Sequence, residues 1–174
     1  MRATSLTVAA LAAALVLTAC DSGGSGDDTQ DSKADAVCVD KLAVEFGPGN
    51  AAPAAGDTGN VPVTVTNRGG GDCTLDGLPA FAFEAGGTST AVAPDQAAAA
   101  GKTTLTKGAS TSFTLTYVRG EGGGTKSLPV KQVKIHLPGA GEPRSFKWSY
   151  GVVALKSDGK TPDASVSGFQ RAGD

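Results

Sequence analysis

Apolar and polar residues alternate along several short stretches of this chain. Val61, Val63 and Val65 are separated by Pro62, Thr64 and Thr66, and similar alternation occurs over residues 42–46, 110–118 and 132–137. Successive side chains of a β-strand point to opposite faces, so a two-residue period is typical of a strand with one buried face. We therefore predict half-buried strands, with Phe113, Leu115 and Tyr117 pointing inward.

Turn-forming residues separate these stretches. The chain has 25 glycines, nine prolines and few aromatic residues, a composition that favours short strands joined by turns. The main predicted strands cover residues 37–46, 61–66, 81–83, 88–93, 103–106, 110–118, 132–137 and 145–150, with further candidates at 152–155 and 164–169. About eight or nine strands at this spacing predict an all-β fold, a β-sandwich over residues 37–170 with a tail at 171–174.

The first residues have the features of an export signal. Arg2 provides a positive charge, residues 6–16 are apolar, and the stretch ends in Leu17-Thr18-Ala19-Cys20. The apolar run is shorter than the about 20 residues of a membrane span, so we expect cleavage after residue 19. The last four residues resemble the bacterial lipobox, which predicts a diacylglyceryl group on Cys20. The alternative is an ordinary secretory peptide in which this cysteine occurs by chance.

Residues 20–36 are predicted to be a flexible acidic linker. Residues 21–36 contain five aspartates and no aromatic or β-branched aliphatic residue, so they cannot contribute to an apolar core. A calcium loop would need the glycine and glutamate spacing of an EF-hand, which is missing. The interpretation is a solvated spacer between the lipid and the domain.

Charge argues against nucleic acid as a partner. The formal charge is -2, and removing residues 1–19 leaves 14 basic against 17 acidic residues, a charge of -3. Nucleic-acid-binding domains usually carry a basic excess. Residues 119–171, however, hold nine basic and four acidic residues, so the second half is the basic one.

Two cysteines remain for the folded domain. With Cys20 assigned to lipid, Cys38 is the only partner for Cys73, and an exported domain is exposed to oxidising conditions. We predict a disulfide between them. The alternatives are two free thiols or a pair of metal ligands.

Two side-chain groups are candidate binding surfaces. Phe146, Trp148 and Tyr150 share one face of the predicted strand at 145–150, which indicates core, with a carbohydrate-stacking platform as the alternative. If the strands at 132–137 and 145–150 pair, a basic face results. Its residues would be Lys131, Lys134, His136 and Lys147. The alternative is a solvated outer face, as sheets of this kind require.

We predict no catalytic residues, no bound metal and no cofactor. His136 is the only histidine and lies on the polar face of a strand, and no Gly-x-Ser-x-Gly elbow is present. Copper handling needs soft ligands, yet Met1 is the only methionine and belongs to the leader. The glycine-rich loops lack the context of a phosphate-binding loop.

One motif carries a family resemblance. Residues 73–79, Cys-Thr-Leu-Asp-Gly-Leu-Pro, follow a Val and Thr strand ending in Asn67, and Phe146-Lys147-Trp148-Ser149 lies near the end. With its CT-x-x-G-x-P pattern the chain resembles domain of unknown function 4232, found in exported actinobacterial proteins, often lipoproteins. The resemblance implies an immunoglobulin-like sandwich with a cysteine pair at Cys38 and Cys73, and no established activity.

Together these observations predict an extracytoplasmic protein anchored to the outer face of the cell membrane through Cys20. We expect a non-enzymatic module that binds an envelope protein or an anionic wall polymer. The alternatives are an envelope-acting hydrolase that uses His136, or a protein that binds a small ligand or metal.

Overall fold

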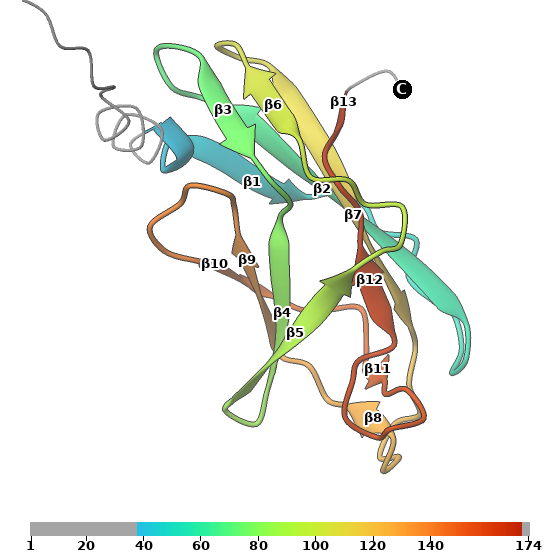
Figure 1. The fold of residues 1–174 in the computed structure, drawn as a ribbon. Coiled ribbons are helices and arrows are strands. Elements are labelled where there is room, and N and C mark those ends of the chain that lie inside the picture. The colour runs from blue at the N-terminus through green and yellow to red at the C-terminus, as the bar shows by residue number, and fades with distance from the viewer. Residues whose placement is uncertain (1–37, 172–174) are drawn as a thin grey trace, which may run out of the picture.

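The computed structural model describes residues 38–171, which form an all-β domain (Figure 1). The strands are β1 (Leu42–Phe46), β2 (Thr58–Asn67), β3 (Cys73–Asp76), β4 (Ala80–Ala85), β5 (Thr88–Pro94), β6 (Lys102–Leu105), β7 (Ser110–Val118), β8 (Ser127–Leu128), β9 (Gln132–His136), β10 (Arg144–Lys147), β11 (Val153–Ala154), β12 (Ala164–Val166) and β13 (Gln170–Arg171). The predicted fold class is confirmed.

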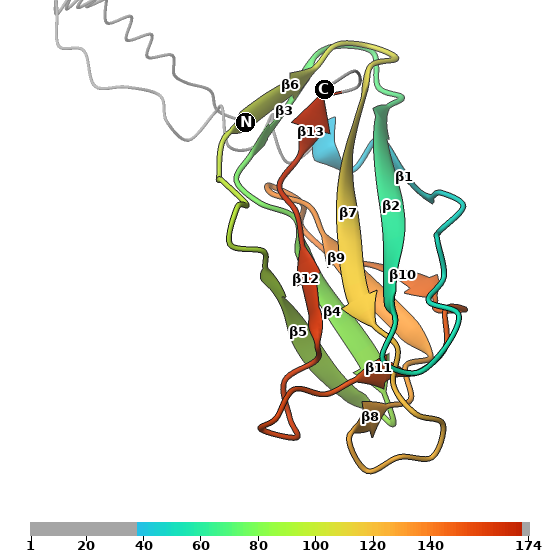
Figure 2. The same cartoon turned by 90° about the vertical axis from the view of Figure 1, so that its right-hand side faces the viewer.

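Eight strands form one curled sheet, in the order β1-β2-β7-β12-β5-β4-β9-β10, and β13 pairs with β7. The first four strands make one layer and the last four make the other (Figures 1 and 2). The layers join through the parallel pair β12–β5, in which Ser165 lies opposite Ala93. The sandwich is therefore continuous at one edge and open at the other, between β1 and β10. Two small sheets, β3–β6 and β8–β11, extend it.

β2 and β7 form the longest strand pair, and their alternation is as predicted. Val61, Val63 and Val65 are fully buried, as are the inward residues Phe113, Leu115 and Tyr117 of β7. Pro62 lies opposite Thr114, but its carbonyl accepts a bond from Gly47 N–H at 2.9 Å. The carbonyl of Pro62 thus points away from β7, toward the residue that follows β1. The N–H that proline lacks would point to the same side, so no hydrogen bond between β2 and β7 is lost.

Aromatic side chains fill the space between the layers. The Trp148 ring lies 5.3 Å from Phe83, 5.1 Å from Tyr117 and 4.9 Å from Tyr150, measured between centroids. Trp148 is 5% exposed, so it packs in the core and does not offer a stacking platform. Its indole N–H donates to the Gly151 carbonyl at 2.6 Å, which satisfies the polar edge of a buried ring.

Side chains hold the open edge of the sandwich together. From β10, Arg144 donates to the carbonyls of Leu42, of Val39 at 2.9 Å and of Asp40 at 3.1 Å. Phe46 of β1 packs against Phe146 of β10 with 5.0 Å between ring centroids. The two edge strands are thus bridged without a backbone ladder.

The first predicted strand is too long at its start. Cys38 and Val39 form a helical turn, in which Lys41 N–H donates to the Cys38 carbonyl at 3.0 Å, and β1 begins only at Leu42. The disulfide and the bonds from Arg144 hold this turn, and both come from distant parts of the chain. Val37 lies outside the described residues.

Other boundaries also differ. The predicted strands at 145–150 and 164–169 end at Lys147 and Val166, and the short strands β3, β8 and β13 were not predicted. Ser167 explains why β12 ends at Val166. Its side-chain hydroxyl accepts the Thr114 N–H at 2.9 Å, in place of a backbone carbonyl of the strand pair.

Candidate functional site

The predicted basic residues surround the hairpin of β9 and β10. In the hairpin, Ser145 lies opposite Lys134 and Lys147 lies opposite Gln132. Residues directly opposite each other share a face of the sheet, and residues two apart along a strand do so as well. The structure therefore brings Lys134, His136 and Lys147 onto the outer face of this layer.

Lys131 is placed differently. It precedes β9, and its carbonyl accepts the N–H of the buried Trp148 at 3.0 Å. It is exposed, but strand alternation does not assign its side chain to the face that carries Lys134.

Lys134 is paired with an acidic neighbour. Its ammonium lies 3.2 Å from Glu84 Oε1, and the pairing of β4 with β9 holds Ala82 opposite Lys134. A hydrogen bond from Ser89 and the nearby Lys134 ammonium lower the pKa of Glu84, against the opposing effect of desolvation. Part of the positive charge of this face is thus neutralised by the sheet itself.

His136 has a main-chain partner. Its Nε2 lies 2.9 Å from the Ala140 carbonyl oxygen in the loop between β9 and β10, so the neutral ring carries its proton on Nε2. Among the hydrogen bonds of residues 38–171, none joins His136 to a serine or aspartate side chain. The arrangement orients the ring and does not assemble a nucleophile with a base.

A shallow groove crosses the outer face beside these residues. It has a volume of about 260 Å³ and runs over β5, β4 and β9. Its floor and rim are formed by Ala80, Ala82, Ala91, Pro143, Lys134 and His136. Sequence analysis identified the two basic residues but not the alanines. The alternation of small residues on β4 and β5 was a usable signal only once β4 was known to lie between β5 and β9.

The predicted disulfide is confirmed. Cys38 and Cys73 are joined by an S–S bond of 2.04 Å, and the two cysteines are 35 positions apart in the sequence. Both sulfurs are consumed, so the alternatives of free thiols and of a two-cysteine metal site are wrong. Cys20 lies outside the described residues.

Two features are absent from residues 38–171. No three His, Cys, Asp or Glu side chains gather in a way that would hold a metal ion. No helix has the length and apolar character of a membrane span.

The model of one protein family, described as a domain of unknown function (DUF4232), matches residues 38–170, which is most of the chain. The chain belongs to the DUF4232 family. Among curated proteins and among solved structures, no match to the chain was found. The DUF4232 match begins at Cys38 and so includes both cysteines of the disulfide.

Proposed function

We propose that this DUF4232 protein is a lipid-anchored, extracytoplasmic binding module without enzymatic activity. The proposal is supported by the apolar leader, by the lipobox-like residues 17–20 and by the acidic linker that follows. The disulfide is consistent with an exported domain, because such bonds persist in oxidising compartments.

The observation that carries the binding role is the groove over β5, β4 and β9. Ala80 and Ala91 are exposed, and Pro143 adds apolar surface at the rim. Contiguous exposed apolar surface with a polar rim is a feature of interaction sites. Lys134 lines the groove, and Lys147 lies on the same face of the neighbouring strand β10; both are cationic.

We infer that the partner is a protein segment with an apolar side chain and a nearby acidic residue. The apolar floor contributes burial, and the lysines favour the approach of a negative group. An anionic wall polymer fits less well, because it would leave the alanine floor without a matching apolar group.

A pair of matched variants tests this function. Full-length tagged protein is cross-linked in native envelopes and recovered, beside variants Ala91→Glu in the groove and Thr106→Glu on the loop after β6. Both replace a small exposed side chain by a carboxylate. We expect a protein to be captured by the wild type and by Thr106→Glu, and to be lost with Ala91→Glu.

Salt dependence separates the two contributions to binding. Lys147→Ala should weaken capture at low salt and have little effect at high salt, because its charge is exposed and screened. Equal capture by Ala91→Glu and the wild type would exclude the groove. Capture of polysaccharide in place of protein would show that the partner is a wall polymer.

A further inference from the structure

A second cavity lies at the end of the domain opposite Cys38. It has a volume of about 490 Å³ and lies beside β8, β11 and the glycine-rich loop at residues 120–126. Both views place β8 and β11 at one end, far from the first described residues (Figures 1 and 2). The cavity shares no residue with the groove on the outer face.

Backbone hydrogen bonds fix the walls of this cavity. Arg119 donates its N–H to the Asp57 carbonyl at 2.9 Å and accepts the Gly56 N–H at 2.8 Å, which holds one wall. On the other side, Leu155 N–H donates to the Lys126 carbonyl at 2.9 Å. The glycine-rich loop closes through the bond from Gly124 N–H to the Glu121 carbonyl, at 3.0 Å. The cavity is therefore preformed, as small-ligand sites usually are.

Two glycines allow a hydroxyl to lie inside the loop. A Cβ on Gly120 would lie 2.6 Å from Ser127 Oγ, and one on Gly124 would lie 3.3 Å from the same atom. Among the hydrogen bonds of residues 38–171, none uses Ser127 Oγ as a partner. The Ser127 hydroxyl and that of Thr125, which also lines the cavity, can both donate to a ligand.

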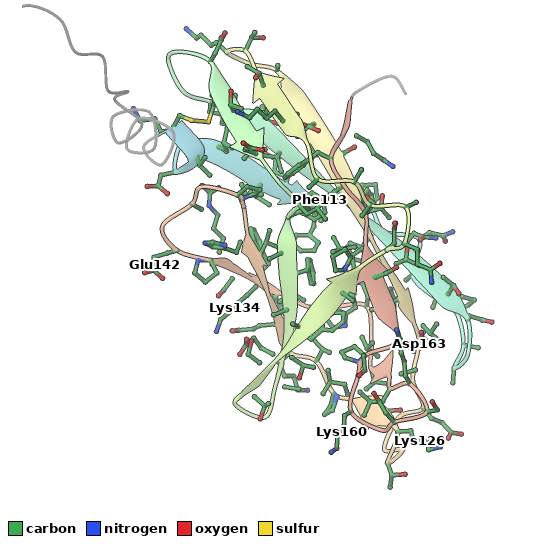
Figure 3. All side chains as sticks on the ribbon, in the orientation of Figure 1. Phe113, Lys126, Lys134, Glu142, Lys160 and Asp163 are labelled. Carbon is green, nitrogen blue, oxygen red and sulfur yellow. A yellow bond between two sulfur atoms is a disulfide. The ribbon has the colours of Figure 1, made fainter. Side chains whose placement is uncertain are left out.

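Three charged residues line the cavity, Lys126, Glu121 and Arg119. The three ion pairs of the described residues include none of these groups. Arg119 Nη1 donates to the Ala52 carbonyl at 2.7 Å and to the Pro53 carbonyl at 3.2 Å, and neither of these residues lines the cavity, so Lys126 is the cation that can contact a ligand there. Lys126 extends at this end of the domain (Figure 3).

We propose that this cavity binds a small organic anion, a phosphate monoester or a carboxylate. The Lys126 ammonium and the hydroxyls of Ser127 and Thr125 would contact the oxyanion, and charge-assisted bonds of this kind are the stronger ones. Ala55 and Leu155, which also line the cavity, would contact the organic part. No aromatic side chain lines the cavity, which disfavours a sugar held by ring stacking. This site is independent of the function proposed above.

Titration of the isotopically labelled full chain tests the site. Methyl phosphate and acetate are added separately at constant ionic strength, with chloride as the balancing ion, and amide signals are followed by NMR. We expect saturable shifts of residues 120–127, and the anion with the lower dissociation constant identifies the preferred group. Lys126→Ala should weaken binding about fivefold or more, because it removes a charged donor.

Lys160→Ala is the matched control, since Lys160 is an exposed lysine at the same end and does not line the cavity (Figure 3). It should leave the dissociation constant unchanged. Glu121→Gln should tighten binding, because it removes a like charge from the rim. The proposal is overturned if neither anion gives saturable shifts. Equal weakening by both lysine variants, or weaker anion binding by Glu121→Gln, would also overturn it.

Discussion

Tyr117→Phe removes one oxygen atom from the core and should lower stability markedly. The Tyr117 hydroxyl donates to the Tyr150 carbonyl at 3.0 Å and accepts the buried Ala52 N–H at 3.2 Å. It thus joins β7 to the loop before β2 and to the segment after β10. Gly59 permits this, since a Cβ there would lie 2.4 Å from the Tyr117 ring.

The magnitude follows from the two bonds. The buried Ala52 N–H loses its partner, at a cost of about 1–3 kcal/mol, and the bond to the Tyr150 carbonyl contributes about 1 kcal/mol more. We expect a loss of about 2–4 kcal/mol in the free energy of unfolding. For a domain of this size that corresponds to a fall in Tm of roughly 7–14 °C. The phenylalanine ring leaves the packing with Trp148 unchanged.

Urea unfolding, followed by the fluorescence of the single tryptophan, measures this difference. Tyr150→Phe is the control, because its hydroxyl makes one long bond of 3.3 Å to the Gly47 carbonyl. It should cost less than about 1 kcal/mol. If the two variants lost equal stability, or if Tyr117→Phe lost none, the hydroxyl would not hold these three segments together.

Two further predictions concern the disulfide and one acidic turn. Replacing Cys38 and Cys73 together by alanine should cost up to about 4 kcal/mol in the chain-entropy model for the 35-residue separation, measured by urea unfolding; a loss under about 1 kcal/mol would contradict it. Bonds from the Thr161 hydroxyl and from the Lys160 and Thr161 N–H groups lower the pKa of Asp158 to about 2. The ionised Asp158 carboxylate, which accepts these bonds, thus stabilises the fold fully above about pH 4, and this stabilisation is lost as the pH falls through about 2. Carboxyl ¹³C NMR should show that midpoint, and Thr161→Val should raise it; an ordinary midpoint in the wild type would refute the assignment.

The central strands could be predicted because the alternation of apolar and polar residues is a property of each strand by itself. The valines of β2 and the inward residues of β7 are buried, and their two-residue period identified both strands without knowledge of the neighbouring strands. The start of β1 could not be predicted in this way. Residues 38–41 turn because Cys73 and Arg144 hold them, and these partners lie 35 and more than 100 residues away.

Asn67 shows the same limit for polar residues. It is 1% exposed, and its amide donates to the carbonyls of Gly71 and Leu105, both at 2.8 Å, while its Oδ1 accepts Gly69 N–H at 2.9 Å. In the sequence it looks like the first residue of a surface turn. Only the approach of β6 reveals that it joins the loop before β3 to the core.

The candidate sites were harder to predict because each one joins separate parts of the chain. The groove needs β4 between β5 and β9, which places Ala82 opposite both Ala91 and Lys134. The cavity needs the turn at residues 54–57, the glycine-rich loop and β11 at one end. In sequence, residues 121–124, Glu-Gly-Gly-Gly, indicate only a flexible loop. Their chemistry arises from the fold, because the backbone bonds of Arg119 and Leu155 bring a lysine, two hydroxyls and an apolar wall around one volume.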